Sequence, residues 1–412
     1  MKSSPVPPNL FKVNRSRLAS LMSPGAVALI GSARRKRRNG DQYYPFRQRS
    51  GFFYLTGINL EESFFAFCPG HADPHLREIL FIRRPTLKSD LWSGPSPGLE
   101  QVRAFSGIAH ARWLEEKEEV LRQLIGDETL VYTDQEEVAG QFPRTEALAP
   151  LLQELRMIKQ PEEIVQIREA AAITRSAFLR VLARTEPGLF EYQLEAEIMG
   201  EIIGRGADGN AFETIVASGK NALVLHYVKN NSQCREGELL LMDFGAEVNH
   251  YAADCSRTIP VSGRFTGRQR LIYEAVFRVF RQARELMLPG TLIADFHQQV
   301  GELWQEEHIG LGLYSRRDVA DHKGPEPLWK NFYMHGTSHS LGLDVHDPFD
   351  RSKPFEPGMV LTCEPAIYIP GEGLGIRLEN DILITEKGPV DLMEDIPMEP
   401  DEIEELMNSA RK

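Results

Sequence analysis

Apolar and polar positions follow two different patterns along this chain. In the first part, short apolar runs at 26–30, 64–67, 78–82 and 129–132 alternate with helical stretches such as 115–124. Runs of four or five apolar residues between turn signals are typical of buried strands, and their alternation with helices is typical of an α/β domain. We therefore expect an N-terminal α/β domain that ends near residue 157.

The pattern changes in the next segment. A proline at 161 followed by two acids fits the first turn of a helix, and apolar residues then recur at helical spacing over 164–182 and again over 271–286. From about residue 215, strand-like runs separated by Gly, Asn and Pro interleave with these helices. The pattern predicts an α+β C-terminal domain, residues 158–412, with a largely antiparallel sheet.

Two of these strand-like runs begin at a glycine and end on an acid six positions later, in 237–243 and 358–364. Each run is followed by a turn-rich stretch with a second acid, Asp254 in the first case and Glu379 in the second. A carboxylate at the end of an apolar strand loses most of its hydration, so it is costly unless it is paired or coordinated. The matching spacing indicates two related hairpins, and metal ions are the natural counter-charge.

Three of the eleven histidines fall within twelve residues, in the segment 335–347. His335 and His339 would share one face of a helix, but Gly336, Gly342 and the lack of an HExxH glutamate favour an extended loop. Only one imidazole needs to bind a metal. The others are then free to bond a substrate carbonyl or to carry protons near neutral pH.

The five side chains Asp243, Asp254, His339, Glu364 and Glu379 form a candidate two-metal site. Oxygen-rich ligation with one imidazole suits Mn, Co, Zn or Fe. At least two ligands must bridge if each ion is to reach a normal coordination number, which gives a pair spaced roughly 3.5 to 4 Å that shares one activated water.

Composition narrows the classes of function. A net charge of −12 argues against a general nucleic-acid binder, and the basic run 34–38 is interpreted as a solvated loop. No apolar run approaches the roughly 18 residues that span a bilayer, and the first eight residues lack the apolar core of a signal peptide. We expect a cytoplasmic protein. Its four cysteines show no CxxC spacing and are expected to be reduced and structural.

Several of these segments resemble those of the pita-bread metallopeptidases, and among them the aminopeptidase P group. The likeness extends to the N-terminal segments 44–48 and 52–57, so it covers nearly the whole chain and implies a creatinase-like N-terminal domain before a pita-bread catalytic domain. The C-terminal segments that carry the resemblance are 242–246, 254–258, 335–347, 356–365 and 375–379.

The resemblance implies that Asp243 holds one metal ion, that Asp254 and Glu379 bridge both, and that His339 and Glu364 complete the other. It favours Mn, with Co, Zn or Fe as alternatives. It also implies catalytic roles for a further set of residues, with Glu364 relaying a proton and the others lining the site or supporting the ligands: His226, His335, His346 and Arg377.

Three more residues are implied at the substrate-binding site. Tyr368 would support the ligand shell, and Arg351 and Trp92 would frame the end of the substrate. A surface arginine and a packed tryptophan are equally good interpretations of the last two on composition alone. Gly51 departs from the family pattern, which often has an aspartate there that is associated with the substrate's amino end or a neighbouring subunit.

The implied activity is release of the N-terminal residue from peptides whose second residue is proline, by a homodimer or homotetramer whose N-terminal domain contributes substrate and subunit contacts. Two alternatives stay open. A prolidase would share the metal ligands but accept only Xaa-Pro dipeptides, and a non-catalytic pita-bread module would use the fold as an interaction surface. Retention of all five ligand positions disfavours the second alternative.

Overall fold

The computed structural model describes residues 5–409, which form two compact units, one of residues 6–156 and one of residues 157–409 together with Pro5. Each unit has its own sheets and is described by itself. The expected combination of an α/β N-terminal part and an α+β C-terminal part is confirmed.

The N-terminal unit is built on a six-stranded mixed sheet in the order β6-β5-β4-β1-β7-β8. The central pairs β1/β4 and β4/β5 are antiparallel, and the outer pairs are parallel. All five residues of β1 and of β4 are buried, as their unbroken apolar runs require. The strands are β1 Val27–Gly31, β4 Ser63–Phe67, β5 Glu78–Ile82, β6 His110–Trp113, β7 Val131–Tyr132 and β8 Thr145–Glu146.

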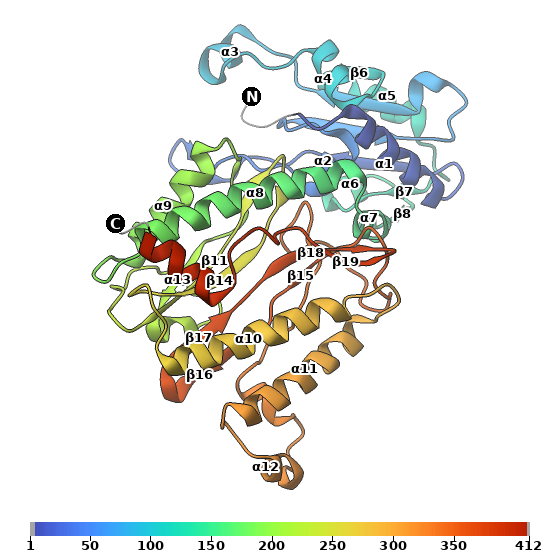
Figure 1. Ribbon diagram of the computed structural model, residues 1–412. Coiled ribbons are helices and arrows are strands. Elements are labelled where there is room, and N and C mark those ends of the chain that lie inside the picture. Colours follow the sequence, from blue (N-terminus) through green and yellow to red (C-terminus); the bar gives the residue numbers. More distant parts are fainter. Residues whose placement is uncertain (1–4, 410–412) are drawn as a thin grey trace. The chain divides into compact units, whose positions relative to one another are not determined.

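Seven α-helices accompany this sheet in the described part of the unit (Figure 1). Arg15 of the first is almost fully buried, where it bonds the carbonyls of Leu55 and Ser106 and forms an ion pair with Glu78. One guanidinium thus joins three segments of the unit. The helices are α1 Pro8–Leu21, α2 Ser50–Thr56, α3 Leu87–Ser93, α4 Leu99–Ser106, α5 Lys117–Leu124, α6 Glu136–Ala139 and α7 Ala149–Met157.

One local expectation for this unit needs correction, and the structure also shows the surroundings of Gly51. The basic run 34–38 is not wholly a loop, because β2 (Arg37–Asn39) pairs with β3 (Gln42–Tyr43) in an exposed hairpin. Gly51 lies inside α2, and a Cβ atom there would stand 2.8 Å from Cδ1 of Leu152. A side chain at position 51 would meet apolar neighbours, so an aspartate there would strain the packing and not simply add a polar contact.

The C-terminal unit contains two strand sets of the same design. In the first, β11 (Leu239–Phe244) pairs antiparallel with β14 (Cys255–Pro260), and a small hairpin of β12 (Ala246–Val248) and β13 (Tyr251–Ala252) lies between them in sequence. Strand β10 (Ile215–Ser218) extends this ladder on the other side of β11. The antiparallel pairing agrees with the sequence pattern.

The second set repeats the order. Strand β15 (Val360–Cys363) pairs antiparallel with β18 (Asn380–Thr385), and the inserted hairpin is β16 (Ala366–Ile369) with β17 (Leu374–Arg377). Strand β19 (Gly388–Asp391) completes the ladder. The spacing of glycine and acid in the sequence therefore reflects a repeated supersecondary unit.

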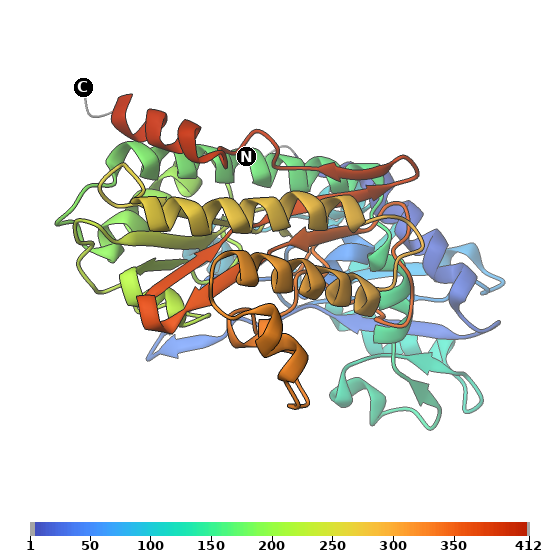
Figure 2. The ribbon, with the colours of Figure 1, turned by 60° about the horizontal axis from the view of Figure 1, so that its bottom comes forward.

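Long amphipathic helices cover these strands. Helices α10 and α11 lie side by side in both views, and α10 packs on β15 and β17 (Figures 1 and 2). Helix α8 packs on α9, α13 and β12. The described helices of the unit are α8 Pro161–Arg184, α9 Glu191–Gly204, α10 Gly267–Leu286, α11 Ile293–Gly310, α12 Arg316–Asp321 and α13 Pro400–Ser409; the remaining strand is β9 Gly209–Asn210.

Candidate metal centre and active site

The ends of the two ladders bring the four acids together. Asp243 lies opposite Ser256 in the β11/β14 register, and Asp254 directly precedes β14. Glu364 directly follows β15, and Glu379 directly precedes β18. The last register pair of these two strands is Cys363 with Asn380. The Glu379 amide donates to the Ser256 carbonyl at 3.1 Å, which ties the two ladders to each other at the acids.

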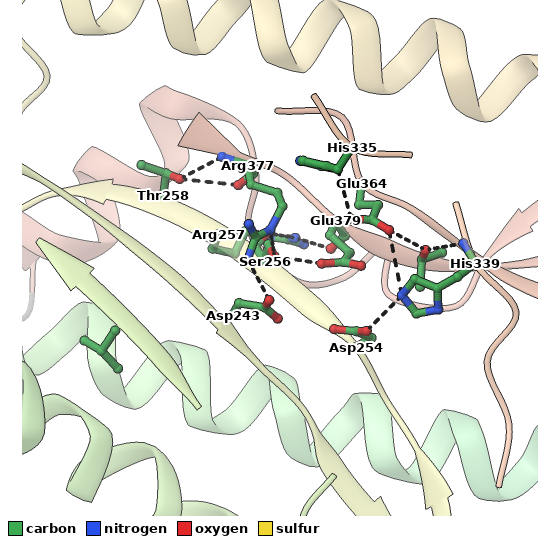
Figure 3. Close-up of polar contacts among 12 residues, drawn as sticks. Asp243, Asp254, Ser256, Arg257, Thr258, His335, His339, Glu364, Arg377 and Glu379 are labelled. Carbon is green, nitrogen blue, oxygen red and sulfur yellow. Dashed lines mark hydrogen bonds and ion pairs between the residues drawn. The ribbon is translucent and has the colours of Figure 1, made fainter. Parts of the chain in front are cut away.

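The histidine-rich segment runs alongside β15 as an extended loop. The Thr362 amide donates to the His339 carbonyl at 2.9 Å, and the Glu364 amide donates to the Thr337 carbonyl at 2.9 Å. The expectation of an extended segment is confirmed. This ladder-like pairing carries the His339 imidazole to the acids (Figure 3).

Three of the five candidate ligands are within reach of one ion. Donor atoms of Asp254, His339 and Glu379 all lie within 4.8 Å of one another. Nε2 of His339 is 3.4 Å from Oδ2 of Asp254 and 3.7 Å from Oε1 of Glu364. Oδ1 of Asp243 is buried and has no hydrogen-bond partner in the described part of the chain. An acceptor that is buried without a donor fits a cation as its partner.

Charge crowding shifts the pKa of several of these groups. Burial and the neighbouring Asp243 raise the pKa of Asp254 to about 7, and burial with the charge of Glu379 raises the pKa of Glu364 to about 8. Burial and Asp254 raise the pKa of Glu379 well above its ordinary value. Burial opposes protonation of His339, but its bond to Asp254 and the charge of Glu364 raise its pKa to about 10. The donor set therefore needs protons or cations to balance it.

Arg377 orders one side of the cluster. Its Nη2 is 2.6 Å from Oδ2 of Asp243, its Nε donates to Oγ of Ser256 at 2.7 Å, and its Nη1 donates to the Tyr368 hydroxyl at 3.0 Å. Ser256 in turn donates to Oε2 of Glu379 at 2.7 Å. The predicted supporting role of Arg377 and Tyr368 matches these contacts. Tyr368 is 1% exposed and lies behind His335 and Arg377 instead of presenting an open face to a ligand.

A second buried arginine was not foreseen from the sequence. Arg257 donates from Nη1 to the Glu379 carbonyl at 2.7 Å and from Nη2 to Oδ1 of Asn380 at 2.7 Å. The Asn380 amide group donates to both carboxylate oxygens of Asp391, at 2.9 and 2.8 Å. An amide at 380 can accept from the arginine and donate to the acid at once, which a carboxylate could not do. The Asn380 side chain thus connects Arg257 to Asp391.

The three remaining candidate histidines line a cavity of about 630 Å³ together with the acids. Burial and Arg377 lower the pKa of His335 to about 4, and its Nε2 lies 3.0 Å from the Tyr368 hydroxyl. Partial burial and His339 lower the pKa of His346, whose ring centroid is 4.1 Å from that of His339. His226 reaches the same cavity from the exposed loop after β10. The neutral imidazoles of His335 and His346 can donate or accept a hydrogen bond.

Arg351 lines the cavity, and its role at the end of the substrate stays a prediction. Trp92 lies on α3 of the N-terminal unit and is 81% exposed. The role of Trp92 stays a prediction. The cavity wall includes residues for which a single sequence offers no signal, since they lie scattered over loops, strand ends and one helix: Phe212, Glu213, Leu225, Val228, His297, Ser338 and Val345.

No helix in the described residues is long and apolar enough to cross a membrane.

In both sequence and fold, the chain is similar to metal-dependent peptidases. The profile of Metallopeptidase family M24 matches residues 165–386, and that of the aminopeptidase P N-terminal domain matches residues 11–132. The chain belongs to metallopeptidase family M24, in the branch that carries this N-terminal domain.

The similarity runs the full length of several relatives. The chain is 38% identical to the Xaa-Pro aminopeptidase of Escherichia coli (strain K12), over 98% of each chain. It is 34% identical to Xaa-Pro aminopeptidase 3 of Homo sapiens, covering 90% of this chain and 79% of that one. Among solved structures, Zn-substituted E. coli aminopeptidase P in complex with product matches with a TM-score of 0.91, at 35% identity over 99% and 100% of the two chains. Pseudomonas aeruginosa aminopeptidase PepP matches with a TM-score of 0.92, at 31% identity over 99% of each. The family and fold class expected from the sequence are confirmed.

Proposed function

We propose that this metallopeptidase is an Xaa-Pro aminopeptidase that removes the first residue from Xaa-Pro-Yaa peptides. The observation that carries the proposal is the convergence of four carboxylates and one imidazole in a cavity that four further imidazoles share. The names of the relatives, which are similar over nearly the full chain, support the same activity. A prolidase remains the alternative, since it would need the same ligands.

The residues fit a pair of divalent ions. In the proposal, Asp243 would hold one ion, Asp254 and Glu379 would be shared by both, and His339 and Glu364 would hold the other. Mn is favoured over Co, Zn or Fe because most donors are carboxylate oxygens. When bound, the ions polarise the scissile carbonyl and make a water molecule acidic enough to attack near neutral pH.

The side chains of this chain then handle protons and position the substrate. Glu364, at the edge of the donor set and open to the cavity, is the carboxylate proposed to take a proton from the attacking water and return it to the leaving nitrogen. His226 and His346 line the cavity and are not among the proposed metal ligands, so their imidazoles can bond substrate carbonyls. Because the Xaa-Pro bond is a tertiary amide without an N–H group, recognition must use the carbonyl and the shape of the pyrrolidine ring.

The test combines metal analysis with peptide assays. Protein purified without added metal is titrated with Mn and assayed on an Xaa-Pro-Yaa tripeptide and on the Xaa-Pro dipeptide. We expect two ions per chain and cleavage of the tripeptide. Glu379→Ala should lose both paired binding and activity, whereas Glu386→Ala, in the exposed turn after β18, should keep both. Cleavage of the dipeptide alone would favour the prolidase, and full activity of Glu379→Ala would remove the bridging assignment.

The proposal includes a cytoplasmic homodimer or homotetramer in which the N-terminal unit supplies subunit and substrate contacts. Helix α3 supports a contact role, since Leu87, Leu91 and Trp92 are 93%, 84% and 81% exposed. Apolar side chains of this size are seldom left together in water without a partner. Sedimentation of the wild type against a Leu91→Ser/Trp92→Ser double variant tests it; an unchanged mass would contradict a role for this helix.

A further inference from the structure

His226 stands on a segment with no regular structure of its own. The loop that carries it runs from the end of the short 3-10 helix η3 (Gly219–Leu223) to Ser232. His226 is exposed to the cavity, whereas the next residue, Tyr227, is 8% exposed. The position of the imidazole must therefore be set by what holds its neighbours.

A single buried carboxylate holds this loop at several points. Glu191, the first residue of α9, is 0% exposed. Its Oε1 accepts from the amide and the hydroxyl of Ser218, both at 2.7 Å, and from the Asn221 side chain at 2.8 Å. Its Oε2 accepts from the Tyr227 hydroxyl and from the Ser232 amide, both at 2.8 Å.

These five donors are all neutral, and they come from before, within and after the loop. A carboxylate is the side chain that can serve so many donors, because its two oxygens offer about four lone-pair sites and no competing hydrogen. The Asn221 side chain also donates to the Tyr227 oxygen at 3.0 Å, so the partners of Glu191 contact one another. We call Glu191, Ser218, Asn221, Tyr227 and Ser232 the loop clamp.

Other contacts at the ends of the loop are consistent with a fixed geometry. Asn230, which has a positive φ of 44°, accepts from the Val216 amide and donates to the Thr214 carbonyl on the strand side. The amide of Glu191 donates to the Ser232 carbonyl at 2.9 Å. The exit of the loop is therefore anchored by bonds to main-chain groups. Next to His226, the Val224 amide donates to the Asn221 carbonyl at 3.0 Å, and the Tyr227 hydroxyl supplies the side-chain bond to Glu191.

We propose that the loop clamp positions His226 for the proposed peptidase reaction, with Glu191 acting through the Tyr227 hydroxyl. Glu191 and Tyr227 touch no reacting atom, so they are positioning residues. The inference rests on the proposed function, in which His226 bonds the substrate carbonyl. Glu191, a buried carboxylate outside the metal site, is then required for turnover. The reason is that a displacement of about 1 Å at a catalytic group can cost on the order of 100-fold in rate.

The test compares two tyrosines that each lose one buried hydroxyl bond. Tyr227→Phe removes the bond to Glu191, and Tyr273→Phe removes a 2.7 Å bond to the Met398 carbonyl in the α10 region. On an Xaa-Pro-Yaa peptide with Mn, we expect Tyr227→Phe to lower kcat/KM by about 10- to 100-fold, and Tyr273→Phe to stay near wild type. Glu191→Gln, whose amide nitrogen cannot accept, should act in the same direction as Tyr227→Phe.

A double-variant cycle separates positioning from a general loss of structure. If Tyr227 acts through His226, then Tyr227→Phe/His226→Ala should be no slower than His226→Ala alone. Multiplying losses in the double variant, or equal activity of Tyr227→Phe and Tyr273→Phe, would overturn the inference.

Hydrogen exchange of the metal-free enzyme gives a readout that does not depend on turnover. Amides of residues 224–231 should exchange faster in Tyr227→Phe than in the wild type and in Tyr273→Phe, and unchanged exchange would overturn the clamp. Failure of the wild type to cleave Xaa-Pro-Yaa peptides is a different result, because it would refute the proposed function while this exchange measurement still reports on the loop.

Discussion

Two neighbouring imidazoles in the cavity differ in the charges around them. His339 contacts Asp254 and Glu364, and these acids raise its pKa to about 10 despite burial, so it is the imidazole that a cation would recruit. His346 lies beside the His339 ring, and partial burial together with that ring lowers its pKa. The geometry thus favours one metal ligand and one neutral imidazole, which spacing in the sequence alone could not decide.

We predict that His346→Ala lowers kcat on an Xaa-Pro-Yaa peptide by roughly 10²- to 10⁴-fold, as expected for loss of a group that shares a proton or stabilises the carbonyl oxygen. The Mn content should stay near wild type, since its proposed partner is the substrate. Steady-state kinetics and metal analysis of the same preparation check this. Loss of one ion per chain would make His346 a ligand instead.

Glu163 offers a test of charge burial away from the metal site. The side chain is 2% exposed, accepts from the Gln160 amide at 2.8 Å and from the Tyr251 hydroxyl at 3.1 Å, and burial is the main cause that raises its pKa from 4.5 to about 7. Lys159 and Asp347, which form a buried ion pair nearby, act on it in opposite directions.

A raised carboxyl pKa means that the folded state holds the proton more tightly than the unfolded state. Between pH 4.5 and about 7 the unfolded chain has lost this proton and the folded chain keeps it, so rising pH lowers stability through this group, and above about 7 the loss is complete. We predict that the free energy of unfolding of Glu163→Gln, measured relative to that of wild type, increases by on the order of 1–3 kcal/mol when the pH is raised from 5 to 8. Denaturant unfolding at both pH values measures it, and a difference between variant and wild type that does not change with pH would contradict it.

At the scale of elements, the two ladders explain why the acids could be found in the sequence. An apolar run from a turn glycine to an acid predicts a strand that delivers a carboxylate, and β11 and β15 do so. The inserted hairpins β12/β13 and β16/β17 were harder to foresee, since each has strands of four residues or fewer. Their short runs carry little periodicity, and long-range pairing decides their conformation.

One close approach within the first repeat holds Asp243 and Asp254 near each other. Gly245 follows β11, and a Cβ atom at this position would lie 1.7 Å from the Ala253 carbonyl oxygen, directly before Asp254. The Ala253 amide donates to the Ala246 carbonyl at 3.0 Å, which closes the inserted hairpin. The nearest atoms are all backbone atoms of Ala253 and Asp254, so there is no flexible side chain that could move aside.

We therefore predict that Gly245→Ala destabilises the catalytic unit by roughly 1–3 kcal/mol or more, and weakens Mn binding because Asp254 must move. Gly237→Ala is a useful contrast, since Gly237 has a positive φ of 81° but no atom within 4 Å of an added Cβ. It should lose stability through backbone strain while it keeps metal affinity. Chemical denaturation and Mn titration of both variants separate the two effects; equal metal affinity for wild type and Gly245→Ala would refute the argument.

At the scale of the whole molecule, the sequence carried the family, the fold class and the positions of all five candidate ligands. The residues that hold these ligands and the neighbouring loop in position could not be predicted from it. Arg257, Ser256 and Glu191 make contacts with residues 27 to 139 positions away, and no local pattern marks such partners. The cavity wall is similar: His297 on α11 and Phe212 after β9 come together only through tertiary packing. Burial and hydrogen bonding decide these roles, and both are properties of the folded chain.

Mutual repulsion among the acids also links metal binding to the stability of the catalytic unit. Any ion that binds the folded state and not the unfolded chain adds RT ln(1 + [L]/Kd), about 2.7 kcal/mol at one hundred times Kd. For a unit of this size, 1 kcal/mol corresponds to roughly 2 to 4 °C in the unfolding midpoint. We predict that chelation lowers the midpoint by about 5 to 10 °C relative to Mn-saturated protein. Scanning calorimetry over a series of Mn concentrations measures the shift, with Glu379→Ala as the variant that should respond much less and Glu386→Ala as the one that should respond like wild type. Because the expected response requires the carboxylates and not merely the negative charge of the protein, equal Mn-dependent shifts in Glu379→Ala and Glu386→Ala would show that the ion stabilises the chain from somewhere else.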